Sequence, residues 1–209
     1  SLEEVQDVLG DLGLHLGNKL GGFYGDDPNR RCGFEAKGLM QICEQAIPFP
    51  RVALHKPTNW IADRLARWIG DRQQEAAQLG TLAGGKYPLL CRLGEPLRAA
   101  VGDLRLIVAD RPLRHSIQSL QRRCRGRDPE VIARHQRWLN EGKRELVASI
   151  PQDKVLRVDY DALLTAPRAT AERLAEFLGF DVDEAAIARA VSYVDPSQQH
   201  IGTAQPAVV

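Results

Sequence analysis

The sequence predicts an α/β fold of three layers, in which a mainly parallel sheet is flanked by helices. Short apolar runs typical of buried strands alternate along the chain with longer segments whose apolar residues recur at helical spacing. The clearest strand is the run LRLIVAD over 104–110, which is followed directly by Arg111 and Pro112. A proline suits the first turn of a helix, and Leu113, Ile117 and Leu120 then repeat at helical spacing.

The composition is that of an ordinary globular protein, with 44% hydrophobic and 26% charged residues in 209. We assign residues 1–200 to a single domain and 201–209 to a tail. A net charge of +1 gives no reason to expect nucleic acid as a partner. No apolar run approaches the roughly 20 residues that span a bilayer, and no signal peptide is visible, so we predict a cytoplasmic protein. The four cysteines form no CxxC pair, so we expect reduced thiols and no metal site.

Amphipathic helices and breaks between them account for most of the first half of the chain. Gly13 ends the first helix, Pro48 and Pro50 stop the second, and Thr58 caps the third. Between the first two lies a stretch rich in Gly, Asp and Asn that is typical of a long loop. In order, we expect a helix over 2–12, a loop over 17–33, a helix from Glu35 to about Ala46, a short strand over 52–55 and a helix over 59–79.

The second half carries the three best strand candidates. Asp128-Pro129-Glu130 combines a helix cap, a first-turn proline and a first-turn acid, and Gly179 is placed to end a later helix. The predicted strands cover 86–91, 104–110 and 154–158, and helices are expected over 95–101, from Pro112 onward, over 128–149, over 167–178 and over 183–191.

Arg111 stands at the carboxyl end of a predicted parallel strand, the edge at which open α/β sheets bind ligands. Ser119 follows eight residues later, about two helical turns away, so it can point to the same side as the strand end. A guanidinium and a hydroxyl in this arrangement favour an anion, above all a phosphate.

The run from Lys86 through Leu120 resembles the middle of sulfotransferases that use 3′-phosphoadenosine 5′-phosphosulfate (PAPS). In that family a lysine-bearing strand leads through a short helix to an apolar strand, an arginine and a serine eight residues later. The arginine and serine bind the 3′-phosphate of the nucleotide, and the resemblance implies that role for Arg111 and Ser119. It also implies the topology of P-loop nucleotide hydrolases and PAPS as the sulfuryl donor, with no metal.

Two further segments are similar to that family. The stretch VDYDALL over 158–164 and the helix after it resemble a Tyr-Glu-Asp-Leu segment whose tyrosine lies against the adenine, which implies this role for Tyr160. The stretch RCGFE over 31–35 resembles a Gly-x-Glu segment whose glutamate serves as catalytic base, which implies this role for Glu35. The resemblance covers most of residues 5–200 and lies in the order of these segments.

Sulfuryl transfer needs a base for the acceptor hydroxyl and a cation at the leaving phosphate oxygen. Glu35 is the candidate base, although an acid at a helix start also simply stabilises the helix dipole. Lys86 is the candidate cation, against the alternative of a solvated lysine beside a turn. His55 is a second candidate base, although a lone histidine is more often structural.

Two elements of that family are not in the sequence. The strand and Pro-x-Ser-Gly-Thr-like turn that bind the 5′-phosphosulfate are expected just before the helix at Leu2, and the Arg-Lys-Gly loop of animal cytosolic members is also missing. From the segments that are present, we predict a PAPS-dependent sulfotransferase that acts on a small-molecule, carbohydrate or peptide hydroxyl. The alternatives are a non-catalytic binding module of the same fold and a nucleotide or small-molecule kinase. A kinase would need a Gly-x4-Gly-Lys-Ser/Thr loop, which is also absent.

For two other groups of residues we expect a structural role. Four arginines between 122 and 127 suggest a nucleic-acid surface, but no aromatic residues interleave with them, so we expect a solvated helix end. The tryptophans stand at helical positions and are expected to pack in the core; they are Trp60, Trp68 and Trp138.

Overall fold

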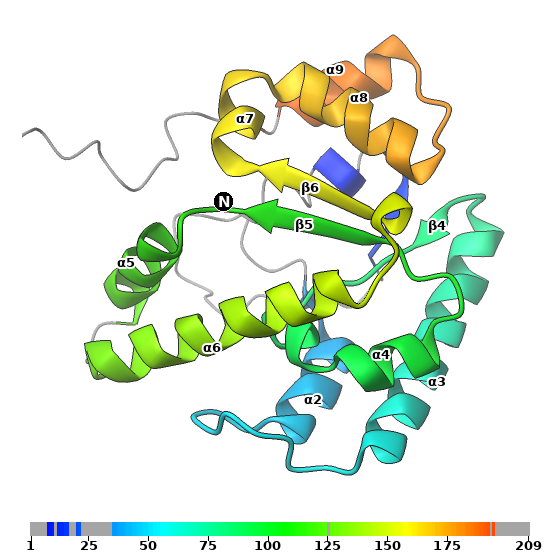
Figure 1. Ribbon diagram of the computed structural model, residues 1–209. Helices are drawn as coiled ribbons and strands as arrows, with labels where there is room; N and C mark the ends of the chain where they lie inside the picture. Colours follow the sequence, from blue (N-terminus) through cyan, green and yellow to red (C-terminus); the bar gives the residue numbers. More distant parts are fainter. Residues whose placement is uncertain are drawn as a thin grey trace, which may run out of the picture.

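The computed structural model describes residues 8–10, 12–16, 20–21, 35–124, 126–192 and 194. Within them the chain is an α/β protein in which helices dominate and the strands are short (Figure 1). Residues 8–10 are helical. The elements that follow are β1 (Leu14–His15), β2 (Leu20–Gly21), β3 (Glu35–Ala36), α2 (Lys37–Ala46), α3 (Thr58–Gln78), β4 (Leu82–Ala83), η1 (Pro88–Arg92), α4 (Gly94–Ala100), β5 (Leu106–Asp110), α5 (Leu113–Arg123), α6 (Pro129–Ala148), η2 (Gln152–Lys154), β6 (Val155–Asp159), α7 (Tyr160–Thr165), α8 (Pro167–Leu178) and α9 (Glu184–Ser192).

The two longest strands among the described residues, β5 and β6, form a parallel pair. Their register runs from Leu106 opposite Val155 to Asp110 opposite Asp159. Figure 1 shows α7, α8 and α9 on one side of this pair and α4 and α6 on the other. Both strands were predicted within two residues of these bounds, and the parallel pairing follows because a helical crossover joins them.

The side chains of β5 and β6 alternate between two hydrophobic clusters, as the period of a strand requires. Ile107 and Ala109 pack against the cluster formed with α8 and α9, where Leu174 is fully buried. Leu106 and Val155 pack against the other cluster, which α2, α3, η1, α4 and α6 share. The pair is therefore covered by helices on both faces.

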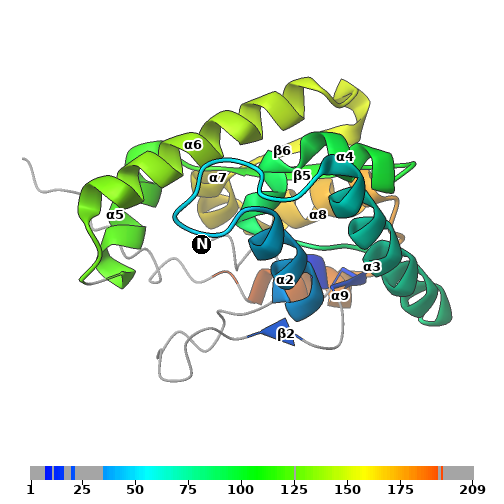
Figure 2. The same cartoon turned by 90° about the horizontal axis from the view of Figure 1, so that it is seen from below.

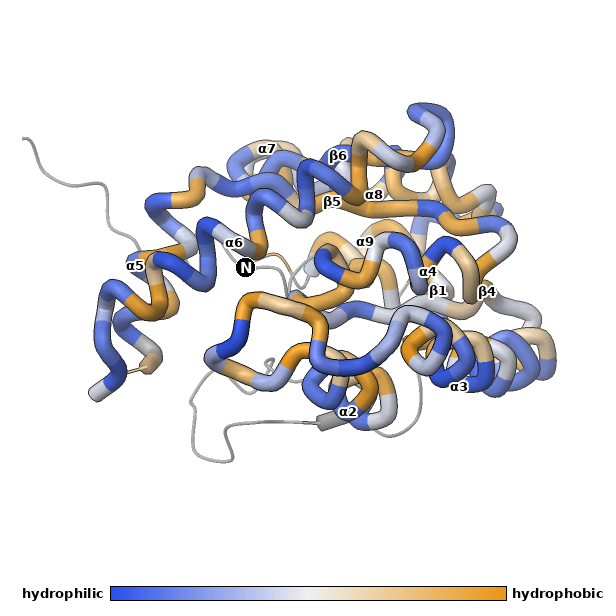
Figure 3. Tube along the Cα trace, turned by 60° about the horizontal axis from the view of Figure 1, so that its bottom comes forward, coloured by the Kyte–Doolittle hydropathy of each residue, from blue (hydrophilic) through white to orange (hydrophobic). Residues whose placement is uncertain are grey.

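Local sequence signals explain the ends of the covering helices. The Asp128 carboxylate accepts a hydrogen bond from the Glu130 N–H (2.8 Å) and caps α6, whose first residue is Pro129. Gly179 ends α8 with φ of 72°, a left-handed conformation that favours glycine. Figure 3 shows apolar and hydrophilic residues alternating along α6, as expected of a helix with one buried face. The cap of α6 and the glycine end of α8 were predicted from the sequence and are confirmed.

The remaining strands are two residues long. β1 pairs with β4 in parallel, and β2 pairs with β3 antiparallel. Among the described residues the strands form three separate pairs, and β1, β2, β3 and β4 were not predicted. Of the predicted fold class, the structure supports an α/β chain with short parallel strands.

The strand predicted over 86–91 is wrong. Residues 86–87 are irregular, and residues 88–91 belong to the 3₁₀ helix η1, which leads into α4. Leu89, Leu93 and Leu97 stand four residues apart and are all buried, so the segment buries one helical face. Pro88 also lacks the N–H that a central strand would donate.

The strand predicted over 52–55 is also wrong. These residues are irregular, and Val52 and Leu54 are exposed because no strand pairs with them. Several helix starts differ from the predicted ones by a residue or two. Glu35, for example, lies in β3 instead of α2, and Thr58 is the first residue of α3 without a side-chain cap bond.

Several predictions lie partly outside the described residues. These are most of the loop over 17–33, most of the helix over 2–12 and the tail after 194, although Gly13 has the positive φ of a helix terminator (106°). The three tryptophans are partly buried against the hydrophobic cluster of α2, α3 and α6, as expected. None of the described helices is long and apolar enough to cross a membrane.

Candidate functional site

Arg111 and Tyr160 meet at the carboxyl edge of the β5–β6 pair. Each is the first residue after its strand, one position beyond the last registered pair. The guanidinium carbon of Arg111 lies 4.9 Å from the centre of the Tyr160 ring, and Tyr160 is 6% exposed. The structure therefore brings together two of the three residues that the sequence assigned to nucleotide binding.

One donor of the Arg111 side chain has no acceptor among the described residues. Its Nε is buried, and no described residue accepts a hydrogen bond from it. A buried N–H without an acceptor costs free energy, so an acceptor at this place would stabilise the guanidinium. An anion such as a phosphate fits this donor, because hydrogen bonds from arginine to phosphate are charge-assisted.

Ser119 lies in α5, which begins two residues after Arg111. The serine is partly buried and is the seventh residue of the helix, about 9 Å along its axis from Leu113. Nearer the helix start, the Arg114 Nε donates to the His115 ring (3.3 Å). Ser119 is thus on the helix that leaves the edge, and its contact with a phosphate stays a prediction.

Asp110, the last residue of β5, joins three elements and was missed in the sequence. Its Oδ1 accepts from Lys143 Nζ of α6 (2.8 Å), and its Oδ2 accepts from Arg157 of β6 (2.8 Å). Burial raises the pKa of the Asp110 carboxyl, but these two hydrogen bonds and the two positive charges lower it more, so the pKa lies below its usual value. The signal available in the sequence was an acid at the predicted strand end, beside Arg111.

Asp159 holds Tyr160 in place from the other strand. Its carboxylate accepts a hydrogen bond from the Ala162 N–H (2.9 Å) and caps α7, so Tyr160 becomes the first residue of that helix. A side chain in the first turn of a capped helix has a fixed backbone beneath it. The Tyr160 ring is therefore anchored on its backbone side and covered by Arg111.

The catalytic candidates lie around α2. Glu35 precedes this helix in β3, and the His55 N–H donates to the carbonyl of Ala46 at its other end (2.7 Å). A ten-residue helix is about 15 Å long, so the backbones of Glu35 and His55 flank opposite ends of α2. The backbones of the two candidate bases are therefore separated by the length of α2.

Lys86 lies in the irregular segment between β4 and η1, beside α2, and is partly buried. A Cβ added to Gly85 would lie 3.0 Å from Leu39 in the first turn of α2. The Tyr87 hydroxyl donates to Glu44 of the same helix (2.7 Å). Lys86 thus stands between a residue that lies near the first turn of α2 and a residue that bonds near its last turn.

Figure 2 shows the segment that joins α2 to α3. His55 belongs to this segment. The ring is exposed, and its Nδ1 is 3.0 Å from a guanidinium nitrogen of Arg51. It borders an open groove of about 390 Å³, whose lining residues are Gln41, Glu44, Gln45, Pro48, His55 and Lys56. A hydrogen-bonded, exposed histidine on an open groove fits the structural reading better than that of a base in a closed site.

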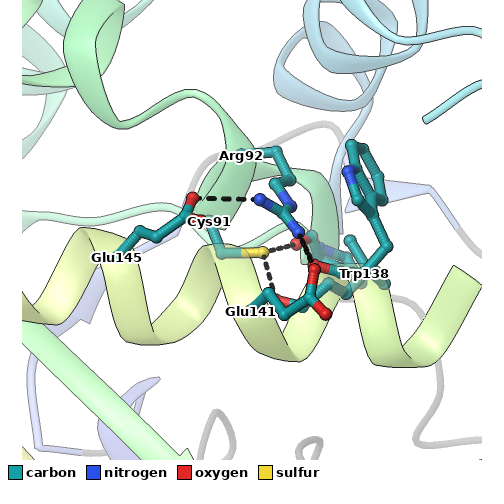
Figure 4. Close-up of polar contacts among 7 residues, drawn as sticks. Cys91, Arg92, Trp138, Glu141 and Glu145 are labelled. Carbon is teal, nitrogen blue, oxygen red and sulfur yellow. Dashed lines mark hydrogen bonds and ion pairs between the residues drawn. The ribbon is translucent and has the colours of Figure 1, made fainter. Parts of the chain in front are cut away.

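A second polar cluster, also missed in the sequence, joins η1 to α6 (Figure 4). Arg92 pairs with Glu145 (3.0 Å) and Glu141 (3.2 Å), donates to the carbonyl of Trp138 and lies over its ring at 4.6 Å. The neighbouring thiol of Cys91 is within 3.3 Å of the carbonyl of Leu139. Burial raises the pKa of this thiol to about 11, so it is protonated at neutral pH and a poor nucleophile.

Two further expectations were a solvated arginine-rich helix end and no metal site. Arg127, at the end of the arginine run, packs its guanidinium on Phe49 at 4.7 Å, while Arg125 lies outside the described residues. The part of the chain that the structure describes contains no cluster of three metal-ligating His, Cys, Asp or Glu side chains.

Comparison with known proteins identifies the family. The family model described as "Sulfotransferase family" matches residues 37–184, more than half of the chain. This range contains the β5–β6 edge with Arg111, Ser119 and Tyr160, and it begins two residues after Glu35. No curated protein and no solved structure gives a significant match. Because the family match covers more than half of the chain, the chain belongs to the sulfotransferase family.

Proposed function

We propose that the protein is a PAPS-dependent sulfotransferase, which moves a sulfuryl group from PAPS to a hydroxyl of an acceptor. Membership of the family indicates sulfuryl transfer in general, and the donor and the acceptor class are our proposal. The observation that carries it is the Arg111–Tyr160 pair at the carboxyl edge of parallel strands, where α/β folds bind nucleotides. The proposal includes a three-layer, mainly parallel sheet of the P-loop nucleotide-hydrolase type.

In this proposal Arg111 and Ser119 bind the 3′-phosphate, and Tyr160 lies against the adenine. A phosphate oxygen would give the buried Nε of Arg111 the acceptor that the described residues do not provide. The guanidinium covers Tyr160 in the structure. When the guanidinium turns toward a phosphate, it uncovers part of the ring, and an aromatic base can then pack there.

The chemical step needs a base and a cation. Glu35 takes the proton of the acceptor hydroxyl, whose oxygen forms the new bond to sulfur. Lys86 stabilises the negative charge that develops on the phosphate oxygen as its bond to sulfur breaks. The path of the chain beside the first turn of α2 supports this pair, because the segment before Lys86 passes there. His55 remains the alternative base, and no metal takes part.

The proposal is tested by incubating the full chain with ³⁵S-labelled PAPS and three acceptor classes: phenols, oligosaccharides and peptides with free hydroxyls. We expect label on one class and its loss in Arg111→Ala. Arg168→Ala is the matched control, because Arg168 is an exposed arginine that pairs with Glu184 on α9. A chain that binds neither PAPS nor its desulfated product, adenosine 3′,5′-bisphosphate, would contradict the proposal. Binding without transfer would favour the non-catalytic module.

A further inference from the structure

We infer that Asp110 is a positioning residue for Arg111: it fixes the end of β5 from which the guanidinium reaches the 3′-phosphate. This inference rests on the proposed nucleotide site, and it assigns a role to Asp110, Lys143 and Arg157. We call these three residues the Asp110 clamp.

The clamp and Arg111 lie on opposite faces of β5. Leu106 packs toward the cluster that includes α6, and Ile107 and Ala109 pack toward the cluster of α8 and α9. Asp110 shares the parity of Leu106, and its carboxylate meets Lys143 of α6. Arg111 has the other parity and meets Tyr160 of α7. The clamp therefore acts on Arg111 through the backbone and does not touch the ligand face.

Both carboxylate oxygens of Asp110 are used, each by a different element. Lys143 comes from α6 and Arg157 from β6, each at 2.8 Å. Asp110 is also the last residue of β5 in the ladder with β6. The next residues, Arg111 and Pro112, have no strand partner in the pair, and α5 starts directly after them. The clamp is thus the last tertiary anchor on this strand before Arg111.

The clamp is partly buried, so its ion pairs are less weakened by solvent than those of a fully exposed pair. The side chains of Asp110 and Lys143 are 31% and 28% exposed, and that of Arg157 is 56% exposed. A three-member network with two short contacts holds its geometry better than an isolated exposed pair. The carboxyl is charged at neutral pH, because its pKa lies below the usual value.

Electrostatics and positioning predict opposite results for Asp110→Asn. Removal of the carboxylate makes the edge more positive by one charge, which by Coulomb attraction alone would strengthen binding of every phosphate-bearing nucleotide. Loss of positioning weakens the contact with the 3′-phosphate instead. The sign of the change therefore separates the two explanations.

The test compares two nucleotides that differ only in the 3′-phosphate, adenosine 3′,5′-bisphosphate and adenosine 5′-monophosphate, by calorimetry on the full chain. We expect the wild-type chain to prefer the bisphosphate. Asp110→Asn should lose roughly three- to tenfold in affinity for the bisphosphate, with the monophosphate changed by less than about twofold. The matched control is Asp103→Asn, because Asp103 pairs with Lys154 (2.6 Å) next to the amino ends of the same two strands.

If Asp110→Asn does not fold, variants of Lys143 test the same inference. Lys143→Met should reproduce the loss of bisphosphate preference, and Lys143→Arg should restore it, because the guanidinium keeps a charged donor to Asp110. An unchanged ratio of the two affinities, or an equal loss of both, overturns the positioning role. A wild-type chain without any preference overturns the proposed nucleotide site and this inference with it.

Discussion

The guanidinium of Arg111 lies over the ring of Tyr160, with 4.9 Å between its central carbon and the ring centre. The two residues are 49 positions apart in the sequence, and they meet because each directly follows one strand of a parallel pair in register. The contact holds the guanidinium at the sheet edge, over a tyrosine that is itself buried.

Arg111→Lys separates charge from shape at this edge. Lysine keeps the positive charge but loses the planar fork and most of the stacking on Tyr160. We expect affinity for adenosine 3′,5′-bisphosphate to fall by about tenfold in Arg111→Lys and by about 10- to 100-fold in Arg111→Ala. Calorimetric titration measures both. Equal affinities in the wild type and Arg111→Ala would remove the residue from the site.

Tyr160→Phe and Tyr160→Ala test the ring. Phenylalanine keeps the aromatic face, so nucleotide affinity should stay within a few-fold of the wild type. Alanine leaves a cavity at a side chain that is 6% exposed and should cost about 3–5 kcal/mol in the free energy of unfolding, besides the loss of binding. Urea unfolding followed by circular dichroism gives the stability, and titration with the bisphosphate gives the affinity. A Tyr160→Phe variant that no longer binds would argue for the hydroxyl instead of the ring.

Glu35→Gln and His55→Ala decide between the two candidate bases. The glutamine variant should lower kcat by about 10²- to 10⁴-fold with little change in affinity for the donor, because a base acts on the acceptor proton alone. His55→Ala should keep most of the activity, since the ring is exposed and bonded to Arg51. Steady-state rates with labelled PAPS measure the difference. The reverse pattern would assign the base to His55.

The Asp110 clamp also predicts a dependence of stability on pH. Burial raises the pKa of Asp110, and the hydrogen bonds and charges of Lys143 and Arg157 lower it further than burial raises it, so the folded pKa is below the ordinary value of 3.8. The stabilisation is complete well above pH 3.8 and is lost as the pH falls through the lower, folded pKa. The difference in unfolding free energy between the wild type and Asp110→Asn should therefore be largest at neutral pH and shrink below pH 4. Urea unfolding at pH 7, 5 and 3 measures it, and a constant difference would contradict the expectation.

Arg92→Met should destabilise the protein without changing nucleotide preference. The substitution removes two ion pairs, a bond to the carbonyl of Trp138 and the contact with its ring. Glu141 and Glu145 are well exposed, so we expect a loss of only about 1–2 kcal/mol in unfolding free energy. Thermal unfolding measures the loss. A changed ratio of bisphosphate to monophosphate affinity would show that this cluster reaches the nucleotide site.

The sequence predicted the elements whose signals are local. The β-branched run of β5, the Asp128 cap of α6 and the Gly179 end of α8 each determine their structure within a few residues. The segment 86–91 failed because a short apolar run fits a strand or a helix equally well. Its outcome is decided by distant packing: a Cβ on Gly142 of α6 would lie 2.9 Å from the carbonyl of Cys91, so η1 lies directly against that helix.

The candidate site likewise contains residues that local signals identify and residues that depend on distant contacts. Arg111 and Tyr160 could be found because each follows a strand with a clear signal, and the resemblance named their partners. For Asp110 the sequence offered only an acid at a strand end. Its role depends on Lys143, which is 33 residues away on another element, and no local pattern links the two residues. The Glu35 and His55 alternatives stay open to experiment, although their backbones flank opposite ends of α2.

The alternation of β5 has a consequence for how this edge can change in evolution. A shift of the strand by one residue against β6 would turn Asp110 toward Tyr160 and Arg111 toward Lys143, so that like charges meet on one face and a carboxylate covers the ring on the other. Insertions and deletions inside β5 should therefore be far more harmful than substitutions of its apolar residues. The pairing register of two five-residue strands carries as much of the site as the side chains themselves.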